Sequence, residues 1–367
     1  MKRIAMIVGL LALSGCGGET PSEDVEAVTS ALSTSKFTAW QAIPGGPPGT
    51  SNFWGRPAIY TDYTNASNRD WSVCESTTVP SILCTDRIIA FGHDYGWQAW
   101  GGPLATPAGV SLGAPASSPA VTRWYDNSNA VWNAFAGREV GGSCPDCIWI
   151  DINQQAGSNT WYLVPNSGPA NGFGATDFSL VASNEYIYIV ASKCSGSTCT
   201  ATYTQNYVGN GYSNAGWSSW VADTAGGVFL QPVIANALPN RSGGSLIVSG
   251  LGLDSHAWFS RIFAGGSWEG GWSTTSAAGV FDDSPSATTF SLGASDLELF
   301  GLGTNTHPYE GSYNSSRTVF DGYYQLGSVV SYHSPASFAP VANIIDLAVD
   351  VDFIDGTAIV VSDYAGP

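Results

Sequence analysis

The sequence predicts an all-β chain that folds into a single β-propeller of about six four-stranded blades. Three observations predict this fold class. A short strand-like element recurs six times at nearly equal spacing, an aromatic segment ends most of the repeats, and the last repeat lacks a strand that the start of the domain can supply. Seven blades are the alternative, because the long second repeat has room for an insertion.

A short apolar element, often opened by proline, marks the start of each repeat. The six copies begin at residues 57, 119, 178, 232, 285 and 340, so they are 62, 59, 54, 53 and 55 residues apart. Six near-equal periods fit a ring better than the rival fold, a pair of β-sandwiches.

Each repeat continues with strand signals. Strongly β-prone runs follow at residues 88–91, 148–150, 186–190, 246–248, 297–300 and 358–361. Tryptophan or tyrosine ends most repeats, at positions 97, 100, 161, 217, 220, 268, 272, 323 and 324. The fourth repeat has four strand signals, at 232–236, 244–251, 256–262 and 268–274, joined by turn residues. Four short strands of this kind make one propeller blade.

The two ends of the domain, residues 36–367, are predicted to close the ring. The last repeat runs out near Tyr364 after three strands. The segment 37–43, which contains Trp40, has the character of the missing fourth strand. Pairing of the N- and C-terminal strands in one blade would leave no open seam.

The first 35 residues read as export and attachment segments. A basic start, Lys2-Arg3, and an apolar run over 4–13 are typical of a secretory signal peptide, assigned to residues 1–15. The following Leu13-Ser14-Gly15-Cys16 resembles a bacterial lipobox, which implies lipidation of Cys16 and attachment to the cell envelope, at the outer membrane or cell surface. An ordinary signal peptide with a chance cysteine is the alternative. Residues 16–35 lack aromatic residues and are predicted to form a flexible tether.

Six cysteines remain after Cys16, in three sequence-local pairs. An even number in an exported chain predicts disulfides. The expected pairs are Cys74–Cys84, Cys144–Cys147 and Cys194–Cys199. The Cys144-Pro145-Asp146-Cys147 spacing also occurs in redox and zinc sites, which is the alternative for that pair.

Composition restricts the partners. The formal net charge is −17, and no basic run occurs beyond Lys2-Arg3, which argues against nucleic acid and against anionic membranes. Membrane contact is expected only through the lipid. Charged residues make up 11% of the chain, against about 25% in an average domain. A surface of Ser, Thr, Asn, Gly and aromatic edges suits carbohydrate.

Four short segments of the sequence point to a family. Residues 97–102 (Trp-Gln-Ala-Trp-Gly-Gly) and 118–124 (Ser-Pro-Ala-Val-Thr-Arg-Trp) are one part of the pattern, and residues 252–258 with 266–272 are the other. Together they resemble the repeat of bacterial β-propeller lectins of the Photorhabdus lectin type, which are akin to tectonin-like propellers. The resemblance extends over most of residues 36–367 and implies a propeller with several shallow sugar sites between blades.

Tryptophans are the first candidates for contact with sugar. An indole face packs on the C–H face of a pyranose ring while neighbouring polar groups bind its hydroxyls. Trp97, Trp217 and Trp268 recur at one position of the repeat and are the candidates; packing between blades is the alternative role. The less periodic Trp54, Trp71 and Trp124 lie near predicted loops and are expected to include exposed residues.

Polar turn residues are the second candidates. His93-Asp94 and Asp254-Ser255-His256 both follow a β-prone run, so we expect them at one rim of the ring, as ligand-binding residues or as plain turn residues.

The sequence predicts neither a cofactor nor a catalytic residue. The four histidines are scattered along the sequence without a metal-ligand spacing, and no hydrolase, metalloprotease or phosphate-loop motif occurs. Asp350, Asp352 and Asp355 are the nearest approach to a calcium site; a solvated strand face is the alternative.

Three functional hypotheses follow. The first is a surface-anchored carbohydrate-binding propeller without catalysis. The second is a glycosidase or lyase, which requires carboxylates or histidines from different blades to converge at one end of the axis. The third is an interaction scaffold of the envelope, which requires a large exposed apolar patch.

Overall fold

The computed structural model describes most of the domain. The described residues are 37, 40–45, 53–65, 68–101, 104–113, 116–154, 160–183, 185–238, 246–275, 281–289, 297–313, 320–341, 344–353 and 356–365. The predicted signal peptide, Cys16 and the predicted tether lie outside them. Within this part of the chain, no helix is both long and apolar enough to cross a membrane.

The strands of the described residues pair into antiparallel sheets. The first is β2 (Phe53–Asn65), β3 (Asn68–Thr77), β4 (Ser81–Ala90) and β5 (His93–Trp97). The second is β6 (Ala120–Tyr125), β7 (Val131–Arg138), β8 (Ile148–Gln154) and β9 (Trp161–Leu163). The third is β10 (Phe178–Ser183), β11 (Tyr186–Ser195), β12 (Thr198–Tyr207) and β13 (Val221–Ala222).

Three further sheets follow. The fourth is β14 (Ile234–Ala237), β15 (Leu246–Leu251), β16 (Ala257–Phe263), β17 (Ser267–Trp268) and β18 (Ser273–Thr274). The fifth is β19 (Ser286–Thr289), β20 (Leu297–Leu302), β21 (Pro308–Tyr313) and β22 (Phe320–Gln325). The sixth is β23 (Ala336–Val341), β24 (Ile344–Phe353), β25 (Gly356–Ala365) and β1 (Gln41–Ala42). Two short 3-10 turns, η1 (Pro169–Asn171) and η2 (Asn214–Gly216), lie in loops.

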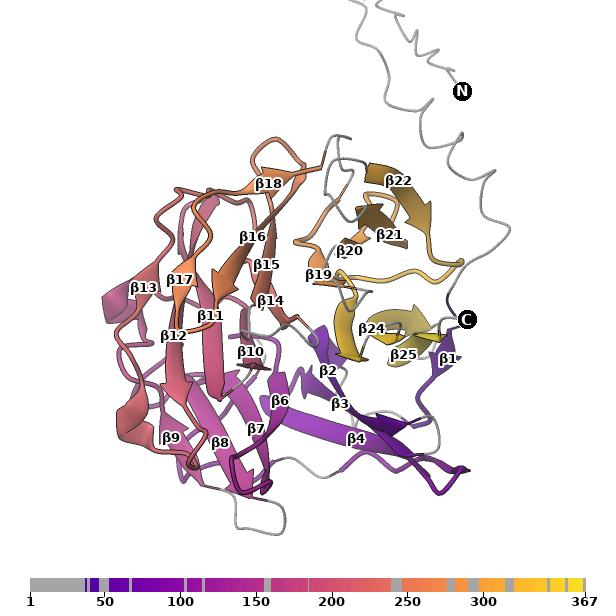
Figure 1. The fold of residues 1–367 in the computed structure, drawn as a ribbon, viewed down its shortest axis with the longest axis horizontal. Coiled ribbons are helices and arrows are strands. Elements are labelled where there is room, and N and C mark those ends of the chain that lie inside the picture. Colours follow the sequence, from indigo (N-terminus) through magenta and orange to yellow (C-terminus); the bar gives the residue numbers. More distant parts are fainter. Residues whose placement is uncertain are drawn as a thin grey trace, which may run out of the picture.

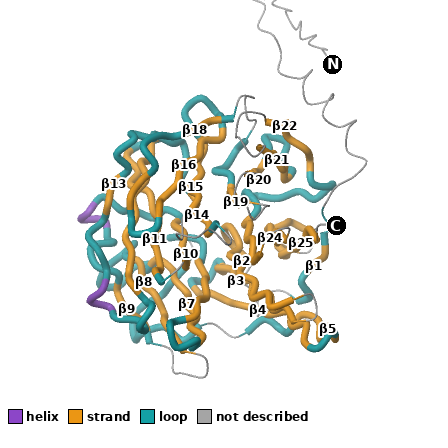
Figure 2. The backbone as a smooth tube through the Cα atoms, in the orientation of Figure 1, coloured by secondary structure: helices purple, strands orange, loops and turns teal. Residues whose placement is uncertain are grey.

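The sheets are arranged around one axis (Figures 1 and 2). Their first strands, β2, β6, β10, β14, β19 and β23, each contact the next, and β23 contacts β2. The apolar core lies in layers between neighbouring sheets rather than in one central mass. The all-β propeller class is therefore confirmed.

The predicted closure by both ends of the domain is also confirmed. The N-terminal strand β1 pairs antiparallel with β25, with Gln41 opposite Val361 and Ala42 opposite Val360. This strand is shorter than the predicted segment, which began at residue 37. The pairing places the first described strand at the outer edge of the last sheet.

Two details of the predicted repeat were wrong. The last inner strand begins at Ala336, directly after Pro335, so Pro340 lies inside β23 instead of opening it. The β-prone runs are not equivalent either: residues 88–91 and 148–150 belong to third strands, whereas 186–190 and 246–248 belong to second strands. Strong β-propensity marks any buried strand, so it does not number strands within a blade.

The three predicted disulfides are present: Cys74–Cys84, Cys144–Cys147 and Cys194–Cys199. Cys74–Cys84 and Cys194–Cys199 join the second and third strands of their blades, and Cys144–Cys147 lies within the loop between β7 and β8. Turns between second and third strands all lie at the same end of the propeller, because the inner strands run in parallel directions around the axis. Covalent links therefore stabilise one end of the first three blades.

An aromatic side chain at the outer strand of a blade ties it to the preceding blade. In five blades this side chain donates a hydrogen bond to the segment that leaves the previous blade. The pairs are Trp40 Nε1 to Leu326 O (2.7 Å), Trp161 Nε1 to Ala105 O (2.6 Å), Trp220 Nε1 to Pro165 O (2.9 Å), Trp272 Nε1 to Asp223 Oδ2 (2.7 Å) and Tyr323 Oη to Thr275 Oγ1 (3.2 Å).

A Trp220→Phe variant should lose about 1 kcal/mol of unfolding free energy, because it removes one inter-blade hydrogen bond and keeps most of the apolar contact. Trp268→Phe is the matched control, since Trp268 Nε1 is buried without a protein partner. Urea unfolding of both variants measures the difference. Equal losses would show that the Trp220 bond contributes nothing.

Candidate functional site

Two cavities open at the end of the propeller that carries the disulfides. In an antiparallel blade, the turn between the second and third strands lies at the same end as the loop that enters the next blade. Both cavities are built from such turns and loops. Residues distant in sequence therefore meet at this end.

The first cavity, here called the interblade pocket, has a volume of about 400 Å³ and lies between the third and fourth blades. It is formed by the loop after β13 and by the β15–β16 turn with parts of the strands that follow. Its lining is Ala225, Gly226, Gly227, Val228, Phe229, Gly252, Leu253, Asp254, Trp258 and Trp272.

Glycines allow two indoles to approach the backbone of this pocket. A Cβ atom at Gly252 would lie 2.4 Å from Trp258 Nε1, and one at Gly227 would lie 2.6 Å from Trp272 Nε1. Such contacts are shorter than any that packed atoms tolerate. Substitution of either glycine would push an indole out of place.

One carboxylate is fixed at the pocket. Asp254 Oδ1 accepts hydrogen bonds from Trp258 Nε1 (2.9 Å) and from His256 N (3.1 Å). Burial alone would raise the pKa of Asp254, but these hydrogen bonds outweigh it, and the pKa is lowered. The group is therefore an anion at neutral pH with a defined orientation.

Apolar surface surrounds that carboxylate. Leu253 is 56% exposed and Val228 is 40% exposed, whereas Phe229 is buried and packs edge-on against Trp272 at 4.6 Å between ring centroids. The pocket thus combines apolar faces with a single oriented acceptor.

The fifth blade repeats this turn with different chemistry. Gly303, Asn305, His307 and Tyr309 occupy the places of Gly252, Asp254, His256 and Trp258, and Asn305 Nδ2 donates to Tyr309 Oη at 2.8 Å. Thr306, like Ser255 in the fourth blade, has a positive φ, of 65° and 59° respectively. An amide here replaces the carboxylate.

The second cavity, here called the axial mouth, has a volume of about 330 Å³ and lies over the end of the axis. Loops from every part of the ring contribute to it. Its lining is Trp54, Arg56, Ala116, Ala175, Thr176, Asp177, Cys194, Gly196, Cys199, Leu230, Gln231, Pro232, Asp283 and His333.

The charged groups of the axial mouth are tied to one another across blades. Arg56 Nη2 donates to Asp283 Oδ2 at 2.7 Å, and Ser334 N donates to the same oxygen at 2.9 Å. Asp177 accepts from Ser118 N (2.7 Å) and Ser118 Oγ (3.1 Å). Arg56 N in turn donates to Ser118 Oγ at 2.8 Å. These bonds hold the ring together at its inner edge.

Asp283 at the mouth is not poised as an acid. Burial alone would raise the pKa of Asp283, but the Arg56 charge and the donors around it lower the pKa instead. Among the described carboxyls, burial raises the pKa of Asp70 and, to about 6, of Asp151. Both belong to strands of the first two blades, β3 and β8, and do not line the mouth.

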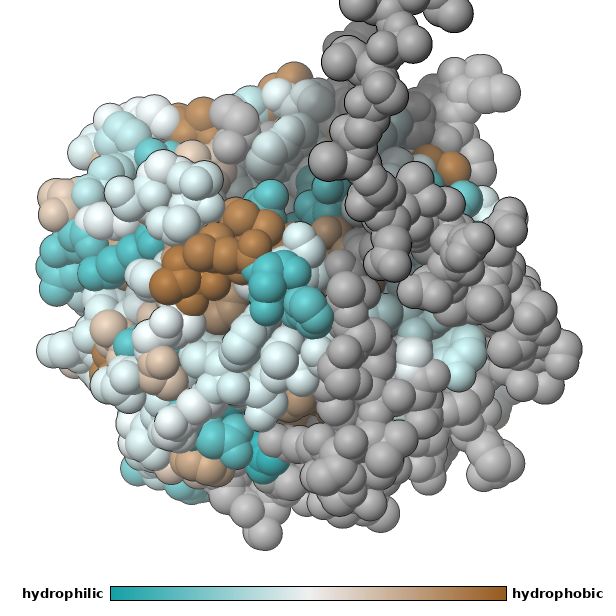
Figure 3. Space-filling view, turned by 90° about the horizontal axis from the view of Figure 1, so that it is seen from above, coloured by the Kyte–Doolittle hydropathy of each residue, from teal (hydrophilic) through white to brown (hydrophobic). Residues whose placement is uncertain are grey.

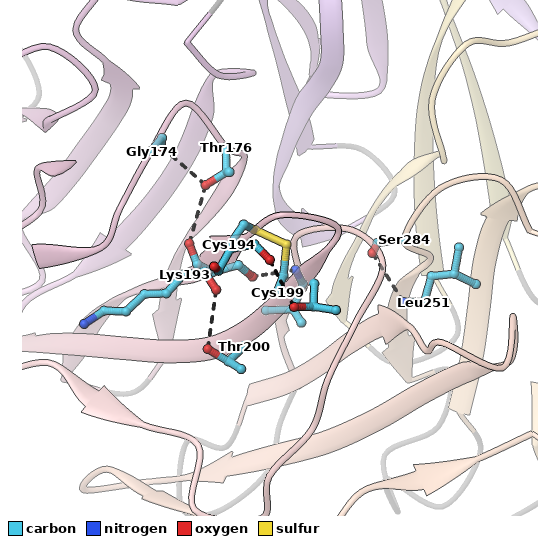
Figure 4. Close-up of a disulfide and its surroundings, with 12 residues drawn as sticks. Gly174, Thr176, Lys193, Cys194, Cys199, Thr200, Leu251 and Ser284 are labelled. Carbon is cyan, nitrogen blue, oxygen red and sulfur yellow. Dashed lines mark hydrogen bonds between the residues drawn. A yellow bond between two sulfur atoms is a disulfide. The ribbon is translucent and has the colours of Figure 1, made fainter.

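A disulfide lies beside the axial mouth (Figure 4). Cys194 and Cys199 face each other across the β11–β12 hairpin. The backbone of Cys199 also pairs with that of Phe229, through N–H to O bonds of 2.8 and 2.9 Å. The disulfide hairpin thereby fixes the loop that borders both cavities.

The structure does not bring the predicted tryptophans together. Trp268 is buried against Tyr203. Trp97 is half-buried against Trp71, and Trp217 donates to Tyr212 Oη at 3.1 Å. Trp97 and Trp217 make these contacts within their own blades, whereas Trp268 packs on Tyr203 of the third blade. All three lie outside both cavities.

The expectation about the less periodic tryptophans was largely wrong. Trp71 and Trp124 are buried, and Trp54 is half-buried at the axial mouth. Their strands turn these indoles into the layers between blades.

The predicted equivalence of His93-Asp94 and Asp254-His256 was wrong. His93 and Asp94 follow the turn between the third and fourth strands of their blade, whereas Asp254 and His256 lie between the second and third. Successive turns of an antiparallel sheet lie at opposite ends. Asp94 instead pairs with Arg87 at 2.6 Å, whose hydrogen bond lowers the pKa of Asp94.

Metal sites are not evident in the described part of the chain, where no group of three or more His, Cys, Asp or Glu side chains is arranged to hold an ion. Asp355 lies outside the described residues, as do the side chains of Asp350 and Asp352. The calcium hypothesis therefore stays a prediction.

Sequence reasoning missed most of the interblade pocket. It found Asp254 and the neighbouring His256, but not Trp258, Trp272 or the loop over 225–232. The near-repeat of residues 252–258 at 303–309 was a signal for a functional turn. The loop carried only the Gly226-Gly227 pair, which is common in turns.

Comparison with known proteins supports the fold. No family model and no curated protein sequence matches the chain. Among solved structures, a variant of the Aleuria aurantia lectin in complex with α-methyl-L-fucoside is similar, with a TM-score of 0.53 and 13% identity over 84% of this chain and 96% of the lectin.

Two other structures are similar over comparable lengths. One is a protein of unknown function from Dyadobacter fermentans, with a TM-score of 0.54, 9% identity and coverage of 90% of this chain and 99% of that one. The other is Trypanosoma rangeli sialidase in complex with sialic acid, with a TM-score of 0.53, 9% identity and coverage of 91% of this chain but 59% of the sialidase. At such identities the likeness concerns the propeller fold.

The raised pKa of Asp151 predicts a pH-dependent stability. Because the folded form holds its proton up to about pH 6, the free energy of unfolding should fall as pH rises from the unfolded pKa of about 4 through that value. Asp151→Asn should remove this fall and stabilise the protein at pH 7.5 by up to about 3 kcal/mol. Denaturant unfolding of both proteins at pH 4.5 and 7.5 measures it; an equal effect at both pH values would contradict the assignment.

Proposed function

We propose that this protein is a carbohydrate-binding β-propeller that holds a sugar in the interblade pocket and does no chemistry on it. The observation that carries the proposal is the pairing of the indoles of Trp258 and Trp272 with the fixed carboxylate of Asp254 in one cavity. Apolar faces accept the C–H face of a pyranose, and an oriented carboxylate accepts its hydroxyl protons.

The charge balance supports a neutral sugar. The chain carries a net charge of −17, and the pocket is lined by one of its anions, Asp254, and by no cation. An acidic ligand would be repelled there. The fucoside-bound lectin among the similar structures shares the propeller fold and is consistent with this class of ligand.

We also propose that the ring has six blades. Six sheets of described strands and the circular contacts among their first strands support this number. A Photorhabdus-type lectin repeat and anchoring to the bacterial envelope through Cys16 remain part of the proposal, on the sequence evidence above.

A glycosidase is the second candidate, because Asp177, Asp283 and His333 from different blades do converge at the axial mouth. Glycoside hydrolysis needs a carboxylic acid that keeps its proton beside a second carboxylate. Asp283 has a lowered pKa beside Arg56, and Asp177 accepts two hydrogen bonds from Ser118. These roles favour structure over catalysis.

A glycan array with residues 36–367 should reveal binding to neutral sugars, and Asp254→Asn should weaken that binding about tenfold or more, since a charged hydrogen bond contributes about 1.5–3 kcal/mol. Because the pKa of Asp254 is lowered, affinity should stay constant from pH 8 to 5.

Asp94→Asn is the matched control, because Asp94 is an exposed turn carboxylate at the opposite end of its blade. It should leave affinity unchanged. Binding to no sugar on the array, or equal losses in both variants, would overturn the proposed site; binding to envelope proteins instead would favour the scaffold hypothesis.

Incubation with chromogenic glycosides and with sialyl-lactose should release no product above the rate of an Asp177→Asn/Asp283→Asn double variant. The reason is that Asp283 has a lowered pKa beside Arg56 and that Asp177 is held by two hydrogen bonds from Ser118. Release by the wild-type protein that the double variant abolishes would establish the enzyme instead.

A further inference from the structure

One loop lines both cavities. Residues 225–229 border the interblade pocket, and residues 230–232 border the axial mouth. Phe229 sits between them with its side chain buried and its backbone paired with Cys199. The two cavities therefore lie on either side of residues 225–232, and the backbone pairing of Phe229 with Cys199 fixes this segment.

The surface between the cavities is apolar. Val228 is 40% exposed and Leu230 is 37% exposed, on either side of buried Phe229, as the alternation of an extended chain requires. Their Cα atoms are two residues apart and so lie within about 7 Å of each other. We call Val228, Leu230 and Leu253 the apolar crest. On the face drawn in Figure 3, a hydrophobic patch lies directly beside hydrophilic side chains.

The axial mouth offers groups that a sugar can satisfy. The Arg56 side chain lines the mouth and is 10% exposed. Asp177 and Asp283 line the same cavity as acceptors. A hydroxyl group both donates and accepts, so one polyhydroxyl ligand can serve the guanidinium and the carboxylates together.

Charged ligands fit the mouth less well. An anion would face Asp177, Asp283 and the net charge of the chain, −17. A cation would compete with Arg56 for Asp283, because the Arg56 guanidinium already pairs with the Asp283 carboxylate at 2.7 Å. The balance of groups thus favours a neutral polyhydroxyl ligand at this second cavity.

We propose that the interblade pocket and the axial mouth form one extended site for a neutral oligosaccharide. One sugar lies in the pocket, the chain crosses the apolar crest, and a further unit enters the mouth. The inference rests on the proposed function, because it assumes that the pocket holds a sugar. It adds that the ligand is a chain of linked sugars.

Titration calorimetry of residues 36–367 tests it with defined probes. These are α-methyl-L-fucoside, the glucose series up to maltohexaose and cellohexaose, and the N-acetylglucosamine series up to chitohexaose. In the series that binds, affinity should rise at least tenfold from the monosaccharide to the trisaccharide or tetrasaccharide. A mere increase in the number of equivalent units would raise it no more than fourfold.

Single variants separate the two cavities. Gln231→Ala, at the exposed edge of the mouth, should reduce the affinity for the longer chain about fivefold or more and leave the monosaccharide unchanged. Trp54→Ala should do the same. Asp254→Asn should weaken both probes. Gln98→Ala is the matched control, since Gln98 is an exposed glutamine outside both cavities, and it should change neither.

The outcomes distinguish the two proposals. If a monosaccharide binds but longer chains bind no better, and Gln231→Ala and Trp54→Ala change nothing, the extended site is overturned while the proposed function stands. If no probe binds, both are overturned. Circular dichroism of each variant confirms that a loss of affinity is not a loss of fold.

Discussion

The hydrogen bond from an outer aromatic side chain to the preceding blade is the interaction on which the rest of the structure depends. A four-stranded sheet leaves two faces to be covered, and only neighbouring blades can cover both. The bond from Trp272 to Asp223 shows how this tie also builds the site. The same carboxylate accepts from Ala225 N and Gly227 N, both at 2.8 Å. Blade packing thus fixes the start of the loop that lines both cavities.

A second set of ties lies at the inner edge of the ring. Hydrogen bonds link the first three blades, from Arg56 to Ser118 and from Ser118 to Asp177. The guanidinium of Arg56 also donates to Asp283 across the mouth. In a chain with 11% charged residues, these charges are employed in joining blades. The Arg56 charge and the hydrogen bond from Ser334 N lower the pKa of Asp283. The ion pair that joins Arg56 to Asp283 across the mouth therefore also keeps this carboxyl ionised at neutral pH.

The periodic features of the fold could be predicted from the sequence. The features that depend on which end of a blade a turn occupies could not. The spacing of the prolines and aromatic residues predicts the propeller fold. The additional strand-like segment around Trp40 predicts the pairing of the N- and C-terminal strands, which the structure shows. Nothing local distinguishes the turn that carries Asp94 from the turn that carries Asp254, because both follow a β-prone run. Nor does a pair such as Trp217 and Trp220 reveal which indole crosses to the next blade.

A repeated scaffold does not require a repeated function. The turn of Asp254 and the turn of Asn305 share a glycine, a histidine and a positive φ, so the backbone is conserved between the fourth and fifth blades. The side chain at the centre differs by one charge. The hydrogen bonds between blades, and not this turn, join the fourth blade to its neighbours. The central residue can therefore be a carboxylate in one blade, Asp254, and an amide in the next, Asn305. Under the proposed function, a neutral sugar that needs a strong acceptor is expected to bind at the fourth blade, where Trp258, Trp272 and residues 225–229 surround Asp254.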